Sequence, residues 1–169
     1  KNYLKIIINT SRGMMELLDN LLDVSRIESG EMMGMQVDFN VKDLIISCVN
    51  QTKNSADKKN IQLGFSIGDS VESIHGNQEQ LSQVLINLIS NAIKFSHAET
   101  SVEVTADILD GQVVIKVTDQ GQGIPESEQV KVFDAFTKTS VRSTAGEGST
   151  GLGLNIAKKL IENHGGKIW

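Results

Sequence analysis

The sequence predicts an α+β fold, a two-layer α/β sandwich in which helices cover one face of a mixed, mostly antiparallel sheet, preceded by one long helix. Segments with the 3.6-residue period of helices alternate irregularly with segments that have the two-residue period of strands, which does not fit a regular βαβ repeat. Two adjacent strand segments, 101–109 and 112–119, are joined by Asp110-Gly111, a dipeptide that favours an antiparallel hairpin. The 169 residues, 39% of them apolar, suffice for one such domain and an appended element.

The first segment, residues 1–29, has the pattern of one long helix that ends at Gly30. Its apolar residues recur at spacings of three, four and seven positions, and they are Leu4, Ile7, Met14, Leu18, Leu21 and Leu22. A single apolar stripe of this length is typical of a helical bundle or a coiled coil. We therefore expect this segment to pack against a second copy of the chain or against a partner helix.

The middle of the chain predicts an extended stretch near residues 36–40, a helix over 42–57 and a strand over 61–67. Apolar residues at every second position of that strand, Ile61, Leu63, Phe65 and Ile67, indicate one buried face. Residues 71–75 could add a short strand.

The next helix is expected to begin after Asn77, an N-cap residue, and Gln80 completes the sequence pattern of a capping box. Three further segments follow the hairpin: a short helix over 126–136, a polar and glycine-rich loop over 137–150, and a helix over about 151–164 that ends at Gly165-Gly166.

The composition excludes several classes of partner. A net charge of −5 without a basic block does not fit a protein that binds nucleic acid or a charged membrane surface. No apolar run approaches the length of a membrane span or a signal-peptide core. Cys48 lies among apolar residues and is interpreted as a buried structural thiol. The histidines, His75, His97 and His164, form no metal-spaced cluster and are interpreted as structural or surface residues.

One face of the helix after Asn77 carries polar side chains at helical spacing, namely Gln83, Asn87, Asn91 and Lys94. A solvated face is one interpretation, although such faces usually carry Glu and Lys, and asparagine lowers helix propensity. The other interpretation is a ligand site. The two asparagine amide oxygens could bind a hard cation such as Mg²⁺, with Lys94 as a charge for phosphate.

The segment 118–125 places Asp119 at the end of a strand, followed by Gly121 and Gly123. An ordinary glycine-rich turn is one interpretation, whereas a calcium loop would need more carboxylates. Alternatively, the carboxylate could accept a hydrogen bond from an exocyclic amine while the glycines let a flat ring approach. Such a site would favour adenine over guanine.

Four glycines lie just before or at the start of the last predicted helix, namely Gly146, Gly148, Gly151 and Gly153. The first three match the dinucleotide pattern G-x-G-x-x-G, but no strand precedes them and no second parallel strand follows. A P-loop is excluded because Leu152 stands where that motif requires lysine. The N–H groups of a helix that begins near Thr150 could bind an anion, so a mobile lid over phosphates fits best.

In combination, these segments resemble the catalytic and ATP-binding domain of sensor histidine kinases, within the superfamily of gyrase-type and chaperone ATPases. Four stretches are similar to the family's motifs and follow in its order: 83–96 (N box), 119–125 (G1 box), 132–138 (F box) and 146–154 (G2 box). Residues 17–32 resemble the second helix of the dimerisation and histidine-phosphotransfer hairpin. The resemblance implies part of that hairpin over residues 1–30 and a Bergerat-type ATP-binding fold over residues 31–169.

The resemblance implies roles for the residues at the end of the N box and in the G1 box. Asn87 and Asn91 would bind Mg²⁺ and the phosphates of ATP, Lys94 would contact phosphate, and Phe95 would pack against adenine. Asp119 would accept a hydrogen bond from the adenine amine. The residues that would shape the base pocket are Gly121, Gly123 and Ile124.

The resemblance also implies that the loop before the last helix faces the phosphates. Lys138 would be aimed at the γ-phosphate, and Arg142 could assist it. Gly151 and Gly153 would lie against the triphosphate, and the other residues expected in this part of the site are Gly148, Thr150 and Leu152. Related ATPases carry a glutamate base at the position of Asn87, so its absence here disfavours water activation and favours transfer to a histidine.

The family's acceptor histidine lies in an H-E-x-x-x-P-like segment, which this chain does not contain. We therefore expect a fragment of a larger kinase, truncated at its last strand, that transfers the γ-phosphoryl group of ATP to a histidine on a separate or missing hairpin. Its expected partners are that hairpin, a response regulator and, in the parent protein, a second copy in a homodimer. The expected location is the cytoplasm, as part of a parent that could be membrane-anchored. The alternative is a non-catalytic nucleotide-binding scaffold, or degenerate kinase module.

Overall fold

The computed structural model describes residues 35–169 and, before them, residues 11, 14, 15, 18, 22 and 25. The helix predicted over residues 1–29 therefore lies largely outside the described residues. Those described positions are helical, and Met14, Leu18 and Leu22 are exposed. Within the described part of the chain, no helix combines the length and the apolar character needed to cross a membrane.

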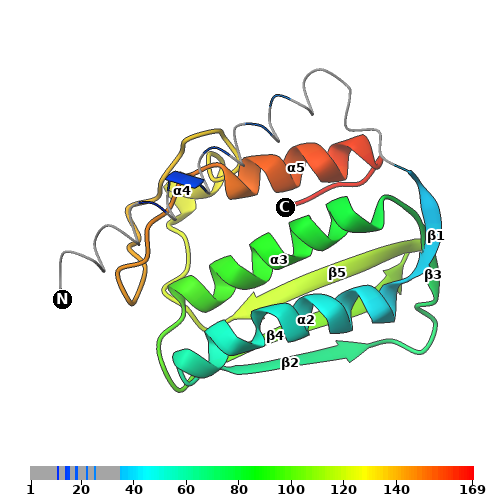
Figure 1. Ribbon diagram of the computed structural model, residues 1–169, viewed down its shortest axis with the longest axis horizontal. Coiled ribbons are helices and arrows are strands. Elements are labelled where there is room, and N and C mark those ends of the chain that lie inside the picture. Colours follow the sequence, from blue (N-terminus) through cyan, green and yellow to red (C-terminus); the bar gives the residue numbers. More distant parts are fainter. Residues whose placement is uncertain (1–10, 12–13, 16–17, 19–21, 23–24, 26–34) are drawn as a thin grey trace.

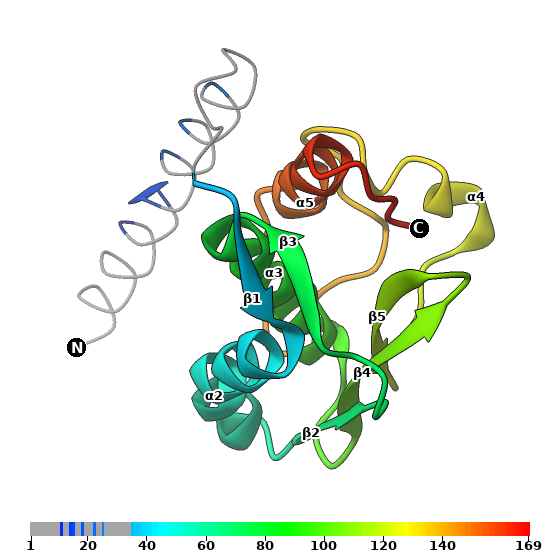
Figure 2. The ribbon, with the colours of Figure 1, turned by 90° about the vertical axis from the view of Figure 1, so that its right-hand side faces the viewer.

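The described domain has two layers, with helices covering one face of a three-stranded sheet (Figure 1). The strand order is β2 (Gln62–Ile67), β4 (Ser101–Leu109), β5 (Gln112–Asp119), with β2 parallel to β4 and β4 antiparallel to β5. A separate antiparallel pair, β1 (Val37–Asn40) and β3 (Ser73–Gly76), lies at one end of the helices (Figure 2). The predicted mixed sheet with helices on one face is confirmed, although this sheet has one parallel and one antiparallel pairing and is therefore not mostly antiparallel.

Three helices run across this sheet: α2 (Val41–Lys58), α3 (Gln78–Phe95) and α5 (Gly153–Asn163). Helices α2 and α3 pack on the sheet, and α5 packs on α3 (Figure 2). The main core lies between α2, α3 and the sheet, where Ile45, Ile89 and Val104 are fully buried. A second, smaller cluster joins α3 to α5 and consists of Val84, Leu152, Ile156, Ala157 and Leu160.

The start of α3 differs from a complete capping box. Asn77 is the N-cap residue as predicted, and its Oδ1 accepts a hydrogen bond from the Gln80 N–H at 3.1 Å. The Asn77 N–H, however, donates to His164 Nε2 at 3.0 Å, while His164 Nδ1 lies 2.7 Å from the Leu160 carbonyl oxygen. These contacts match the ring tautomer of His164 that donates through Nδ1 and accepts through Nε2. The predicted structural role of His164 is confirmed, and it links the end of α5 to the start of α3.

The helix predicted over 126–136 is wrong in length, because α4 covers Glu126–Gln129 alone. Beyond it the chain continues in successive turns closed by hydrogen bonds between residues three apart, and Phe136 has φ +61°. Two of the apolar residues that suggested the longer helix, Val130 and Phe136, are 86% and 64% exposed. Without a core to pack on, an amphipathic pattern of this length does not sustain a helix.

The remaining predictions depart from the structure by small amounts. The short strand expected at 71–75 is β3, which begins two residues later and ends one residue later than predicted. The strand 61–67 buries Ile61 as expected, but Phe65 is 42% exposed because it borders an open hollow beside the start of α2. The hairpin turn is confirmed, with positive φ at both Asp110 and Gly111. Cys48 is fully buried, and burial raises the pKa of its thiol against the smaller lowering effect of a hydrogen bond with the Ser82 side chain.

Candidate functional site

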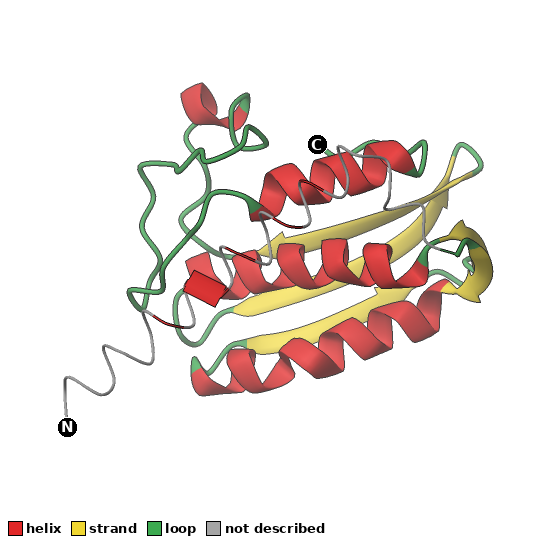
Figure 3. Ribbon diagram, turned by 45° about the horizontal axis from the view of Figure 1, so that its top comes forward, coloured by secondary structure: helices red, strands yellow, loops and turns green. Residues whose placement is uncertain are grey.

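The motif residues collect at the end of the helical layer that lies opposite the β1–β3 pair (Figure 1). The C-terminal end of α3, the end of β5 and the start of α5 all lie at this end. The chain between α4 and α5 loops out over it (Figure 3). Residues 137–152 of that chain are called the glycine-rich loop below.

The polar face of α3 contacts the glycine-rich loop and the start of α5. Asn87 Nδ2 donates a hydrogen bond to the Gly153 carbonyl at 2.8 Å. Lys94 Nζ donates to the Gly148 carbonyl and lies 5.6 Å from the centre of the Phe95 ring. Asn91 is half-buried on the same face, between these two contacts. The structure therefore brings the N box and the G2 box together.

The glycines of the motifs fall into two kinds according to what a side chain would meet. At Gly121 a Cβ would lie 2.8 Å from the Phe95 carbonyl oxygen, and at Gly153 it would lie 2.7 Å from Asn87 Oδ1. At Gly151 it would lie 2.7 Å from the Thr137 carbonyl oxygen. Gly123 and Gly148, in contrast, have nothing within 4 Å of such an atom. The first kind packs the site together, whereas the second leaves space in which a ligand could approach the backbone.

Asp119 closes a turn at the exposed end of β5. Its Oδ1 accepts a hydrogen bond from the Gly121 N–H at 2.8 Å. Because a carboxylate accepts through two oxygens, this turn orients the side chain and leaves acceptor capacity for a ligand. Ile124 nearby in the sequence is 40% exposed. A flat ring with a donor amine remains compatible with this geometry.

The polar side chains of the candidate site suit a metal ion that binds together with a phosphate ligand. The described residues contain no group of three or more His, Cys, Asp or Glu side chains placed to hold a metal ion. Mg²⁺ is commonly held by one or two protein oxygens together with substrate phosphates and water. The amide oxygens of Asn87 and Asn91 fit that mode. They do not form a cage that would hold the ion by itself.

The other residues expected in the site lie in the glycine-rich loop. The Leu152 side chain is 1% exposed in the cluster between α3 and α5, so its backbone alone can face a ligand. Thr150 Oγ1 accepts from the Leu152 N–H at 3.3 Å and orders the residues just before α5, which begins at Gly153. Lys138 and Arg142 are exposed. The Arg142 carbonyl accepts from Gln122 Nε2 at 3.2 Å, which connects the loop to the G1 box.

Two residues at this end, Lys59 and Asn155, were not predicted from the sequence. Lys59, at the end of α2, lies within hydrogen-bond distance of both the end of α3 and the glycine-rich loop. Asn155 in α5 donates through Nδ2 to the Phe133 carbonyl at 2.9 Å and so joins α5 to the F box. No sequence signal marks Lys59, because it follows another lysine and its loop partners lie 85 and 88 residues further along the chain.

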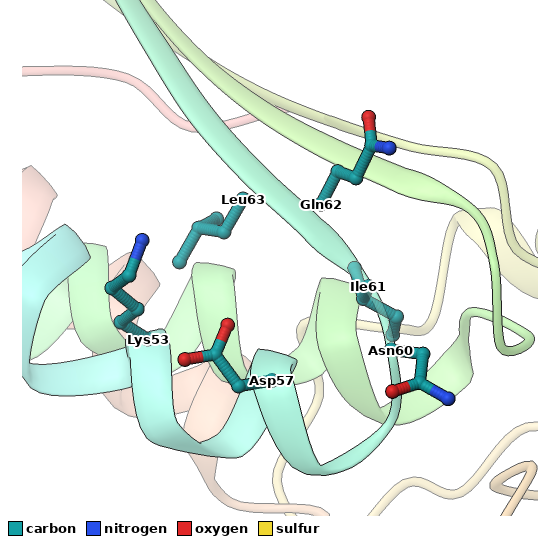
Figure 4. A pocket seen from close by; sticks show the side chains of 6 residues that line it. All are labelled: Lys53, Asp57, Asn60, Ile61, Gln62 and Leu63. Atoms are coloured by element: carbon teal, nitrogen blue, oxygen red, sulfur yellow. The ribbon is translucent and has the colours of Figure 1, made fainter.

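Two surface hollows occur away from the motif residues. One, of about 470 Å³, lies between α2 and β2 (Figure 4) and is lined by Lys53, Asp57, Asn60, Ile61, Gln62 and Leu63. The other, of about 350 Å³, includes Phe65 and Lys42. Neither is lined by a residue of the N, G1, F or G2 boxes, so both hollows are separate from the candidate site.

Comparisons with known proteins agree with the motif order. Residues 76–169 match the family model described as "Histidine kinase-, DNA gyrase B-, and HSP90-like ATPase". The chain is 33% identical to the circadian input-output histidine kinase CikA of Synechococcus elongatus over 170 residues, which are 99% of this chain and 22% of that protein. It therefore spans about a fifth of the length of this curated relative.

Solved structures of histidine kinases are similar in fold. The catalytic domain of the histidine kinase ThkA gives a TM-score of 0.71 at 32% identity, covering 80% of this chain and 86% of that chain. A structure of ThkA in complex with the response regulator protein TrrA gives a TM-score of 0.77 at 26% identity and covers 100% of this chain and 46% of that chain.

Proposed function

Because the chain belongs to the histidine kinase-, DNA gyrase B-, and HSP90-like ATPase family, we propose that it is the ATP-binding catalytic part of a sensor histidine kinase. The proposed reaction transfers the γ-phosphoryl group of ATP to a histidine on a phosphotransfer hairpin. One observation carries the proposal. The N box meets the glycine-rich loop and the start of α5 through the Lys94–Gly148 and Asn87–Gly153 contacts, across 54 and 66 residues of chain.

The proposed roles follow from the placement of these side chains. Asn87 and Asn91 would hold the phosphates together with the Mg²⁺ that accompanies the nucleotide, and this ion would supply neutralisation of the phosphate charge. Lys94 already binds a carbonyl oxygen of the loop, so a phosphate oxygen is a stronger acceptor of the same kind for its ammonium group. Asp119 accepts from the adenine amine beside the open backbone of Gly123.

The proposed phosphoryl transfer needs no general base at Asn87. In transfer to an imidazole, the P–N bond forms as the bond from the γ-phosphorus to the ADP oxygen breaks, and ADP leaves. The nucleophilic nitrogen of a neutral histidine carries its own lone pair, whereas an attacking water must lose a proton. An amide at Asn87 therefore suits a histidine acceptor better than hydrolysis.

The proposed partners are the acceptor hairpin, a response regulator and a second copy of the parent protein. The regulator is supported by the structure of ThkA in complex with the response regulator protein TrrA. The second copy is supported by Met14, Leu18 and Leu22, whose exposed apolar side chains follow helical spacing in the described residues. We place these interactions in the cytoplasm.

Titration calorimetry with Mg-ATP tests the nucleotide site. We expect saturable binding that Asn91→Ala weakens on the order of tenfold or more, since a hydrogen bond to a charged group is lost. Asn54→Ala is the matched control, because Asn54 is exposed on α2 away from the motifs. Binding that is absent, or indifferent to Asn91→Ala, would contradict the proposed site.

Phosphotransfer is tested by mixing the chain with Mg-ATP and a separately produced hairpin that carries an acceptor histidine. Phosphohistidine, recognised as acid-labile and base-stable phosphate, is the expected product. A folded mixture that binds ATP yet forms no phosphohistidine would instead support the non-catalytic nucleotide-binding scaffold.

A further inference from the structure

Lys59 connects three parts of the molecule through one ammonium group. Its Nζ lies 2.8 and 3.0 Å from the carbonyl oxygens of Ile93 and Lys94, 2.6 Å from Thr144 Oγ1 and 3.2 Å from Glu147 Oε1. The side chain is 15% exposed, so these interactions are partly shielded from water. Lys59 is the C-cap residue of α2, and no motif includes it.

The first of these contacts is with the end of α3. The last carbonyl groups of a helix lack partners within the helix and carry partial negative charge, so a cation beside them is stabilising. Thr144 reinforces this attachment, because its N–H donates to the Lys94 carbonyl at 3.2 Å and its Oγ1 lies 2.7 Å from the Ser96 carbonyl oxygen. The loop residue Thr144 is thus fixed to the end of the N-box helix.

The second contact fixes the next residues of the glycine-rich loop. Glu147 Oε1 accepts a hydrogen bond from Lys59 Nζ, and Glu147 Oε2 accepts one from the Ala145 N–H at 3.1 Å. Ser143 Oγ donates to the Glu147 carbonyl at 2.8 Å. Residues 143–147 therefore form a closed turn attached to Lys59. Immediately beyond this turn lies Gly148, whose carbonyl accepts from Lys94.

We propose that Lys59 is a positioning residue for the triphosphate, because it anchors residues 143–147 of the glycine-rich loop to the end of α3, immediately before Gly148 and the residues that would face the phosphates. Ordering a loop on binding costs conformational entropy, and a loop attached in advance loses less of it. The inference rests on the proposed nucleotide site. It predicts a specific pattern, in which loss of Lys59 weakens binding through the phosphates and spares binding through the base.

The test compares Lys59→Met with Lys58→Met. Both substitutions remove one positive charge at the end of α2, but Lys58 is exposed. We expect Lys59→Met to raise the Kd for Mg-ATP on the order of tenfold and to change the Kd for adenosine, measured by NMR titration, less than about twofold. Lys58→Met is expected to change neither. Tryptic cleavage after Arg142, within the loop, is expected to accelerate in Lys59→Met alone.

The outcomes separate this inference from the proposed function. If the unmodified chain binds neither Mg-ATP nor adenosine, both are overturned. If it binds Mg-ATP and Lys59→Met binds it equally well, Lys59 has no positioning role. Equal losses for Mg-ATP and adenosine would indicate a general structural role and would also overturn the inference. Should Lys59→Met fail to fold, Glu147→Gln is tested in its place. It removes the ion pair between Lys59 and the loop and keeps the contacts of Lys59 with the carbonyl groups at the end of α3. It is expected to raise the Mg-ATP Kd about threefold without affecting adenosine.

Discussion

Gly151 occupies a conformation and a position that other residues tolerate poorly. Its φ is +74°, and a Cβ there would lie 2.7 Å from the Thr137 carbonyl oxygen and 2.8 Å from the Phe136 carbonyl carbon. Both neighbours are backbone atoms, which cannot move aside as a flexible side chain could. The absence of a side chain at Gly151 therefore allows the two ends of the glycine-rich loop to pack closely against each other.

We expect Gly151→Ala to lower the free energy of unfolding by about 1–3 kcal/mol, as is typical of strained left-handed residues. Gly64→Ala in β2 is the control, because a Cβ there has nothing within 4 Å and its φ is not in the positive range. Urea unfolding followed by circular dichroism measures both. Equal midpoints for the two variants would show that the loop shifts to accept the added methyl group.

At the scale of elements, the glycine-rich loop is attached partly by a charge that depends on pH. Burial tends to raise the pKa of the Glu147 carboxyl, but hydrogen bonds from its own N–H, Lys59 and the Ala145 N–H outweigh burial and lower the pKa below 4.5. A lowered pKa means that the folded state prefers the ionised carboxyl. The stability gained from Glu147 is therefore complete above about pH 4.5 and is lost as the pH falls through the lower, folded value.

The measurement is the free energy of unfolding of the unmodified chain minus that of Glu147→Gln, as a function of pH. We expect a difference of about 0.5 kcal/mol at neutral pH, since the Glu147 side chain is 37% exposed and exposed ion pairs contribute little. The difference should shrink below pH 4.5. A difference that grows on acidification would contradict the assigned sign.

Elements whose sequence signal is local were predicted well. The start of α3 was predicted from Asn77 and from the apolar residues at helical spacing after it, and the structure begins the helix there. The prediction of a helix over 126–136 was wrong because Val130 and Phe136 are exposed and do not pack on the core, so burial does not stabilise a longer helix there. Local pattern predicts which segments can be helical, whereas packing decides how far they extend.

The candidate site was predictable in its motifs but not in its attachments. The resemblance assigned the four boxes to one site, and the structure brings two of them, the N box and the G2 box, together through Asn87 and Lys94. Lys59 gave no signal because its significance depends on the end of α3 and on Thr144, which are distant in sequence. Contacts of this kind exist only after the fold has formed, so a single sequence does not reveal them.

At the scale of the whole molecule, the two hydrophobic clusters divide the domain unequally. The main core joins α2, α3 and the sheet, whereas α5 is held by the smaller cluster with α3 and by the His164 link to Asn77. A segment with fewer buried apolar contacts opens at a lower free energy than the core. Because α5 follows the glycine-rich loop directly, its opening would also release the phosphate side of the candidate site.

Amide hydrogen exchange of two leucine variants tests whether α5 opens as a separate unit. Leu160 is fully buried in the smaller cluster and Leu44 is 1% exposed in the main core, so each leucine-to-alanine change should cost about 2–5 kcal/mol. If α5 detaches while the main core stays folded, the open state retains Leu44 and loses Leu160. Leu44→Ala should then accelerate exchange in β4 and leave α5 unchanged, whereas Leu160→Ala should accelerate exchange in both. Equal acceleration of α5 by the two variants would mean that the domain unfolds as one cooperative unit and that the candidate site opens only with it.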